Sequence, residues 1–133
     1  MTVRFEHFAL NLTQPREFAT WYLDQLGCTV VAQGGPPKYT TFLADASGRT
    51  FVEVYHNDAA PVDDFRSRLP LTFHFAFQTD DAAGLRDRLL EAGATLEEEQ
   101  HPEPMTHLVM LRDPWGLPLQ LCQRRSPYPT RER

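Results

Sequence analysis

Cysteine is scarce in this chain, and long apolar runs are missing. Only two cysteines, Cys28 and Cys122, occur in 133 residues, too few for a disulfide framework and wrongly spaced for a zinc finger. No apolar run has the length that crosses a bilayer, and the amino-terminal residues lack the apolar core of a secretion signal. We therefore expect a cytoplasmic protein with no membrane partner, whose cysteines are small buried residues.

An excess of positive charge is also missing. The chain has 13 basic and 18 acidic residues, a formal net charge of −5, and its one basic cluster lies in the tail from residue 124. Nucleic-acid binding requires a basic face, so we expect no nucleic-acid partner. The hydrophobic content of 41% suffices for a globular core, either of one domain or of two half-sized modules.

What the sequence does contain is a repeat. The tripeptide His-Phe-Ala begins at His7 and again at His74, 67 positions later. Each copy runs from an alternating, strand-like segment through a polar turn into a helical pattern that stops at a glycine. An Asp followed three residues later by a Gly also occurs in both halves, at residues 45–48 and 113–116. Elements repeated in the same order predict two modules of one fold.

The pattern of each half is one strand, one helix and three further strands. In the first module, about residues 3–56, we expect strands at 3–12, 29–33, 38–45 and 50–56, with a helix that begins near Pro15 and stops at Gly27. In the second module, about residues 71–123, we expect strands at 71–79, 94–99, 106–112 and 117–123, with a helix over 81–92. Residues 57–70 are predicted to link the modules, and residues 124–133 to form a tail. The predicted fold class is α+β, with two βαβββ modules.

Strand alternation places two ligand-type side chains on one face of each module. Successive side chains on a strand point to opposite faces. On this basis His7 and Glu53 share the less apolar face of the first module, and His74 and Gln120 share that of the second. The opposite faces are rich in valine and leucine and are predicted to pack against the helices.

These residues resemble the vicinal oxygen chelate superfamily. The resemblance rests on the paired histidines, on the FVEVY segment around Glu53, and on residues 112–121, RDPWGLPLQL, which match the family signature Asp-Pro-x-Gly-x-x-x-Glu-Leu. The family includes glyoxalase I, methylmalonyl-CoA epimerase, fosfomycin- and bleomycin-resistance proteins and extradiol dioxygenases. The resemblance implies a single domain over residues 1–133, whose two modules form a curved mixed-sheet cup around a metal or ligand.

A metal site follows from the same resemblance. Position by position, the ligands would be His7, Glu53, His74 and Gln120, a set that suits a divalent Zn, Ni, Co, Fe or Mn ion. The family's metal enzymes usually have Glu at the position of Gln120, and in glyoxalase-like members that Glu also transfers the proton. An amide cannot serve as a base, so Glu53 is the candidate catalytic residue. Two alternatives stay open: both histidines are hydrogen-bonded interior residues, or the chain binds a ligand without metal, as many family members do.

The sequence gives weaker signals for substrate contacts than for the metal ligands. Arg112 could bind a carboxylate or phosphate, or pair with a surface acid. The candidate substrate-binding residues are Phe51, Tyr55, His107, Arg112 and Trp115.

The resemblance favours a glyoxalase-like metal-dependent isomerase or lyase that acts on a small oxygen-bearing molecule. The alternatives are a metal-free small-molecule binding protein of the bleomycin-resistance type and, ranked last, an extradiol-type dioxygenase, because that chemistry uses the Glu that Gln120 replaces. A homodimer is the expected assembly, since small chains of this family often dimerise.

Overall fold

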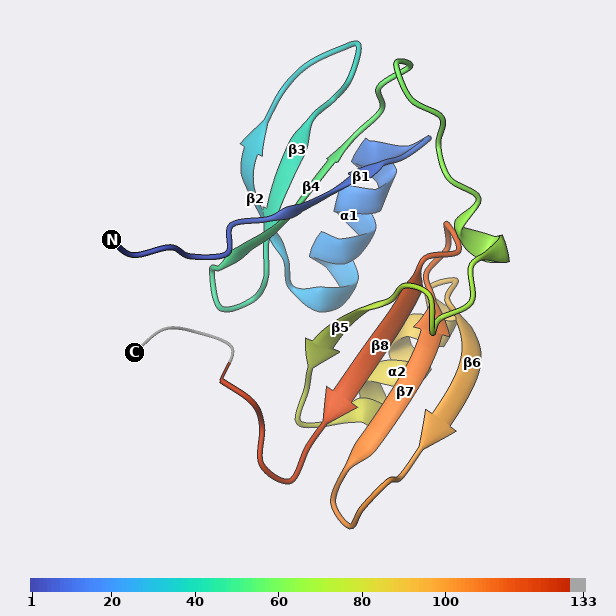
Figure 1. Ribbon diagram of the computed structural model, residues 1–133. Helices are drawn as coiled ribbons and strands as arrows, with labels where there is room; N and C mark the ends of the chain where they lie inside the picture. Colours follow the sequence, from blue (N-terminus) through green and yellow to red (C-terminus); the bar gives the residue numbers. More distant parts are fainter. Residues whose placement is uncertain (130–133) are drawn as a thin grey trace. The chain divides into compact units, whose positions relative to one another are not determined.

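The computed structural model describes residues 1–129. The chain forms two compact units, and the boundary between them in the sequence falls between Asp63 and Asp64. Each unit contains one α-helix and one four-stranded sheet (Figure 1). The boundary lies inside the segment that the sequence predicts as a linker, so residues 64–70 belong to the second unit.

The first unit is a βαβββ module. Its elements are β1 (Phe8–Asn11), α1 (Pro15–Leu26), β2 (Thr29–Gln33), β3 (Thr41–Ala44) and β4 (Thr50–Tyr55). The strand order is β1-β4-β3-β2, with β1 parallel to β4 and the other pairs antiparallel. The sheet is therefore mixed, and its first and last strands are neighbours.

The second unit repeats this topology. After a short 3-10 helix, η1 (Phe65–Ser67), it contains β5 (Phe75–Gln78), α2 (Ala82–Glu91), β6 (Thr95–Gln100), β7 (His107–Arg112) and β8 (Pro118–Gln123). The strand order is β5-β8-β7-β6, and β5 is the strand parallel to its neighbour. The prediction of two βαβββ modules in an α+β fold is confirmed.

The repeat extends to the strand register. In the first sheet Ala9 of β1 pairs with Glu53 of β4, and in the second Ala76 of β5 pairs with Gln120 of β8. The two pairs are related by the same 67-residue shift that relates His7 to His74. The predicted ligand positions are thus structurally equivalent in the two units.

Each helix covers the apolar face of its own sheet. Helix α1 packs on β3 and β4, where Val52 and Val54 are buried, and α2 packs on β7 and β8, where Leu119 and Leu121 are buried. In Figure 1, α2 lies behind the sheet formed by β5 to β8. On β4 burial alternates as the sequence predicts, because Val52 and Val54 point away from Glu53. On β8, Leu119 and Leu121 point away from Gln120, but Pro118 and Cys122 on the face of Gln120 are buried as well.

The helix ends have clear local causes. Pro15 opens α1, where its missing N–H costs no hydrogen bond, and Gly27 ends the helix with a φ of 68°. The side chain of Asp81 caps α2 by accepting a hydrogen bond from the Gly84 N–H at 2.9 Å. These boundaries agree with the sequence pattern.

The opening strand of each unit is shorter than predicted. The sequence predicts strands over 3–12 and 71–79, whereas β1 covers four residues and β5 covers four. A strand persists only where a partner offers its backbone groups. The partners β4 and β8 begin at Thr50 and Pro118, so in the parallel registers the residues before Glu6 and before His74 have no strand residue opposite them.

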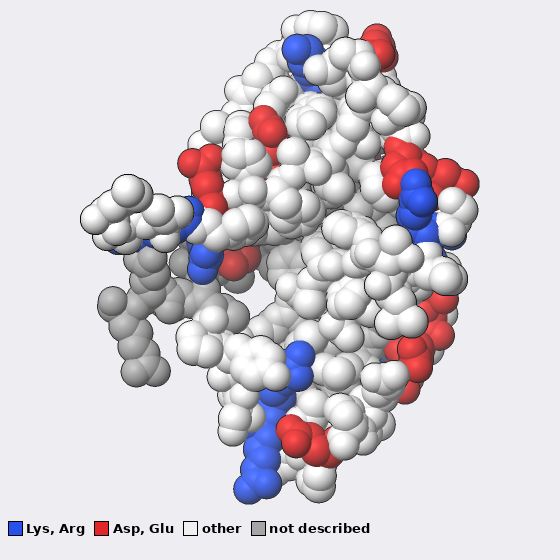
Figure 2. Space-filling model, in the orientation of Figure 1, with Lys and Arg blue, Asp and Glu red and all other residues white. Residues whose placement is uncertain are grey.

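The surface carries mixed charge. On the face drawn in Figure 2, the Lys and Arg side chains of the described residues are interspersed with Asp and Glu and form no continuous basic patch. Over residues 1–129, no helix combines the length and the apolar character needed to span a membrane.

Candidate functional site

The first candidate pair, His7 and Glu53, lies together in the first unit. His7 directly precedes β1, and Glu53 lies on the neighbouring strand β4. The His7 Nε2 atom is 3.6 Å from the Glu53 Oε1 atom, and both side chains are partly exposed, at 30% and 23%. This distance exceeds that of a hydrogen bond. The two atoms are therefore close but not hydrogen-bonded to each other, and both keep their lone pairs for another partner.

The other ring nitrogen of His7 has a partner of its own. Its Nδ1 atom is 2.8 Å from the Glu6 Oε1 atom. An ionised carboxylate only accepts hydrogen bonds, so Nδ1 carries the proton and Nε2 is left with the lone pair in the neutral ring. The ring also meets Phe42 edge to face, with the centroids 5.2 Å apart.

The second pair, His74 and Gln120, lies in the second unit. His74 directly precedes β5, and its Nδ1 atom is 2.8 Å from the Pro70 carbonyl oxygen. A carbonyl only accepts, so this ring too carries its proton on Nδ1 and presents Nε2. The Gln120 Oε1 atom accepts a weak hydrogen bond from the Cys122 thiol at 3.4 Å.

The two histidines therefore share the arrangement of metal-binding imidazoles. A metal-ligating histidine almost always donates its other N–H to a carboxylate or a backbone carbonyl, and His7 and His74 use one of each. Glu53 and Gln120 each add an oxygen donor to the histidine of their own unit, and nitrogen and oxygen donors of these kinds suit divalent transition metals. Within residues 1–129, no three His, Cys, Asp or Glu side chains converge on one point. Each unit thus supplies two of the four predicted ligands.

Aromatic side chains surround Glu53 on its face of the first sheet. Phe51 and Tyr55 lie two residues either side of it on β4, and Phe42 is its cross-strand partner on β3. All three are partly exposed. They give this face an apolar character beside a single carboxylate.

Arg112 is buried rather than open to a ligand. Only 9% of the residue is exposed, and its guanidinium donates to the side chain of Glu97 and to three backbone carbonyls, those of Phe65, Arg68 and Gly116. These four bonds favour the alternative of a structural ion pair over contact with a substrate.

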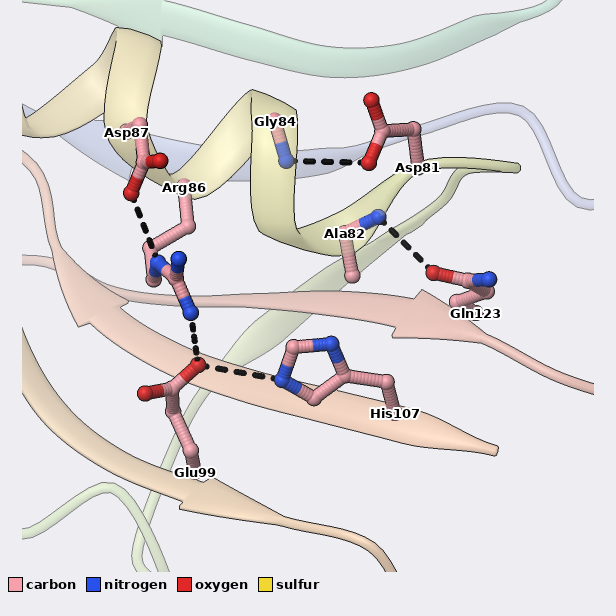
Figure 3. A network of polar contacts seen from close by, with 8 residues as sticks. All are labelled: Asp81, Ala82, Gly84, Arg86, Asp87, Glu99, His107 and Gln123. Carbon is pink, nitrogen blue, oxygen red and sulfur yellow. Dashed lines mark hydrogen bonds and ion pairs between the residues drawn. The ribbon is translucent and has the colours of Figure 1, made fainter. Parts of the chain in front are cut away.

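His107 points to the helix side of its sheet. It pairs with Gln123, whereas Gln120 pairs with Met110, so His107 and Gln120 lie on opposite faces. Figure 3 shows His107 in a network with Glu99 and with Arg86 of α2. The guanidinium of Arg86 lowers the pKa of the Glu99 carboxyl, with a further contribution from His107.

Trp115 lies in the turn between β7 and β8, where it is partly buried. Its backbone N–H donates to the buried Asp113 carboxylate at 3.0 Å. The Leu117 N–H donates to the same oxygen at 2.9 Å. The backbone of Trp115 is thus part of a closed turn, and the predicted contact of its ring with a substrate stays a prediction.

Residues 4–121 match the family model described as Glyoxalase/Bleomycin resistance protein/Dioxygenase superfamily. The chain belongs to this superfamily. The resemblance inferred from the repeated histidines and the late-strand motifs is confirmed for the family as a whole. No curated protein matches the chain.

Solved structures of the superfamily share the fold at low identity. The glyoxylase/bleomycin resistance protein/dioxygenase domain from Frankia sp. EAN1pec has a TM-score of 0.67 and 20% identity, covering 94% of this chain and 100% of its own. TnmS3, an antibiotic binding protein from Streptomyces sp. CB03234, has a TM-score of 0.66 and 17% identity, covering 92% and 96%. FosX from Listeria monocytogenes, complexed with Mn(II) and sulfate, has a TM-score of 0.64 and 12% identity, covering 92% of each chain.

Two supporting residues of this superfamily member escape sequence reasoning. Glu6 and Pro70 orient the rings of His7 and His74. An acidic residue beside a candidate ligand is a weak signal that the sequence does offer for Glu6. Pro70 acts through its carbonyl, which every residue has, so no sequence signal marks it.

Proposed function

We propose that this chain is a metal-dependent enzyme of the isomerase or lyase type acting on a small oxygen-bearing molecule. Its ligands would come as two half-sites, His7 with Glu53 and His74 with Gln120. The observation that carries the proposal is the shared state of the two histidines, each with Nδ1 held by an acceptor and Nε2 presented.

In the proposed reaction, a bound ion and Glu53 would have separate tasks. A divalent ion supplies electrophilic polarisation of a substrate oxygen. Glu53 is a partly exposed carboxylate and can take a proton from the carbon beside that oxygen, then return it to the neighbouring carbon. Gln120 cannot exchange a proton near neutral pH, so it serves in binding only.

The phenyl and phenol rings around Glu53 fit this role. Phe42, Phe51 and Tyr55 would cover the apolar part of a substrate and limit the access of water to the carboxylate. The candidate ions remain Zn, Ni, Co, Fe and Mn, and the structural neighbour FosX is complexed with Mn(II).

The aromatic face also favours a second function, that of a metal-free binding protein. Superfamily neighbours include TnmS3, an antibiotic binding protein. In this alternative the same rings would hold an aromatic or hydrophobic compound, and the histidines would serve as hydrogen-bonding groups.

Metal content distinguishes the two functions. Protein purified without a metal-binding tag is incubated with each candidate ion, dialysed and analysed for bound metal. We expect near-stoichiometric metal in the wild type and in His101→Gln, a histidine outside both half-sites, and its loss in His7→Gln and His74→Gln. Absence of metal from the wild type under all conditions would contradict the enzyme and leave the binding protein.

Activity then tests the base. Glyoxalase-type and epimerase-type substrates are screened with the metal-loaded protein. Glu53→Gln retains an oxygen donor but no base, so we expect about 10²- to 10⁴-fold slower turnover, the usual loss for a general base. Light scattering with and without metal would test the expected homodimer.

A further inference from the structure

The segment before β5 is bound tightly to the second unit. Its 3-10 helix η1 lies against the turn between β7 and β8, where the Arg66 guanidinium donates to the Pro114 carbonyl. The approach is close, because a Cβ atom on Gly116 would lie 3.1 Å from the Arg66 backbone nitrogen and 2.2 Å from its Cγ atom. The segment 65–70, which we name the bracket, is thus a fixed part of this unit.

Arg112 is the main link between the bracket and the sheet. Its guanidinium donates to the carbonyls of Phe65 at 3.0 Å and Arg68 at 2.8 Å, and to Gly116 of the turn at 3.1 Å. Its Nε–H donates to Glu97, which stands at an irregularity of the β6–β7 pairing. A buried guanidinium with this many partners fixes their geometry, because its N–H groups are held in one plane.

The last residue of the bracket, Pro70, bonds His74. Two residues after Arg68, the Pro70 carbonyl accepts the Nδ1–H of His74 at 2.8 Å. Between them, the Leu69 carbonyl accepts the Thr72 N–H at 2.8 Å, which closes a tight turn. The carbonyl that Arg112 holds, that of Arg68, is thus two residues from the carbonyl that bonds His74.

We propose that Arg112 is a positioning residue for His74. By holding the bracket, it places the Pro70 carbonyl that keeps His74 in the Nδ1–H tautomer, with the Nε2 lone pair open. The tautomer of a histidine is set by the hydrogen bond that its other nitrogen makes. The consequence for metal binding rests on the proposed function, whereas the control of the tautomer does not.

The first unit shows that the fold does not require this device. Ala44 occupies the position equivalent to Arg112, since Ala44 pairs with Thr29 at the start of β2 as Arg112 pairs with Thr95 at the start of β6. At the irregularity of the β2–β3 pairing stands Val31, where the second unit has Glu97. The two units therefore hold their histidines differently: a side chain, Glu6, holds His7, and the bracket holds His74.

Nitrogen NMR of the metal-free protein tests the proposal. Imidazole ring nitrogens are labelled with ¹⁵N, and spectra are recorded at pH 8.5, where an unperturbed imidazole is neutral. The His74 signals are assigned by their loss in His74→Gln. In the wild type we expect the Nδ1–H tautomer to dominate. In Arg112→Lys, which keeps the charge but not the fork of donors, we expect a shift toward the Nε2–H form that free histidine prefers.

The control is Arg86→Lys. Arg86 bonds Glu99 and Asp87 in the same unit (Figure 3). Among the described residues, the side-chain hydrogen bonds of Arg86 go to these two carboxylates and to neither the bracket nor His74. This variant should leave His74 as in the wild type. If Arg112→Lys fails to fold, as judged by circular dichroism, Glu97→Gln provides the test, since it loosens Arg112 and should shift the tautomer in the same direction.

Zinc titration separates this proposal from the proposed function. We expect Arg112→Lys to weaken Zn²⁺ binding by about 10- to 100-fold, the usual effect of losing support for a ligating histidine. A folded Arg112→Lys or Glu97→Gln with an unchanged His74 tautomer would overturn the positioning role, even if the wild type binds zinc. A wild type that binds no metal but whose tautomer responds would overturn the metal site and leave the positioning role intact.

Discussion

Burial suppresses the ionisation of Cys28. The residue is 4% exposed, and burial, with a smaller contribution from the negative Asp45, raises the pKa of its thiol from 9.0 to about 12. The thiol is thus neutral at physiological pH and a poor nucleophile. Burial also raises the pKa of Cys122, in agreement with the prediction that both cysteines are small apolar residues.

This shift predicts a pH dependence of stability. Between pH 9 and pH 12 the unfolded chain releases the Cys28 proton while the folded chain retains it. Rising pH therefore favours the unfolded state, by at most ~1.4 kcal/mol for each pH unit. In urea unfolding we expect the wild type to lose stability faster than Cys28→Ala across this range. Parallel curves for the two proteins would contradict the shift.

Sequence reasoning at the residue level succeeds where the repeat provides an internal comparison. The alternation pattern predicts that His7 and Glu53 share a face, and the His7 Nε2 atom lies 3.6 Å from the Glu53 Oε1 atom. For Arg112 the repeat offers no comparison, because Ala44 stands at its equivalent position. The partners of Arg112 include the carbonyls of Phe65 and Arg68, and backbone groups distant in sequence leave no mark on the pattern of side chains.

At the scale of elements, the turns before β4 and β8 are close copies. The carboxylates of Asp45 and Asp113 each accept backbone N–H groups two and four residues later. Gly48 and Gly116 have φ values of 89° and 90°, a region that other residues enter only under strain. The turns differ in their surroundings, because nothing lies within 4 Å of a Cβ atom on Gly48, whereas Arg66 of the bracket crowds Gly116.

The matched pair Gly48→Ala and Gly116→Ala measures the docking of the bracket. Gly48→Ala should cost about 1–3 kcal/mol of unfolding free energy from backbone strain alone. Gly116→Ala adds the overlap with the Arg66 backbone, so we expect a larger loss. It should also accelerate tryptic cleavage after Arg66 or Arg68. Equal losses with unchanged cleavage would show that the bracket is not held at Gly116.

The element boundaries show how far pattern alone can reach. The strand predicted at 29–33 agrees with β2 in both bounds, since β3 provides a partner along its length. The strand predicted at 38–45 is shorter, at 41–44. The Tyr39 N–H donates to the Gly35 carbonyl in a turn, and Tyr39 has a φ of 51°, so the residues before Thr41 cannot continue the strand. Apolar alternation indicates which residues can form a strand, but the partner strand decides where pairing ends.

At the scale of the whole molecule, the repeat predicted from sequence is also the repeat of the structure. Two units with one topology carry equivalent pairs of candidate ligands. The domain arrangement and the completion of a metal shell from two half-sites stay predictions. They depend on long-range assembly, which neither strand alternation nor motif spacing encodes.

X-ray absorption at the zinc edge of the zinc-loaded protein tests the central claim most directly. The spectrum reports the ligand types and the number of imidazoles around the ion. We predict a shell of nitrogen and oxygen only, with two imidazoles in the wild type and one in either His7→Gln or His74→Gln if zinc is retained. A shell with a sulfur ligand, such as Cys122, or with two imidazoles that persist in either variant, would contradict the account.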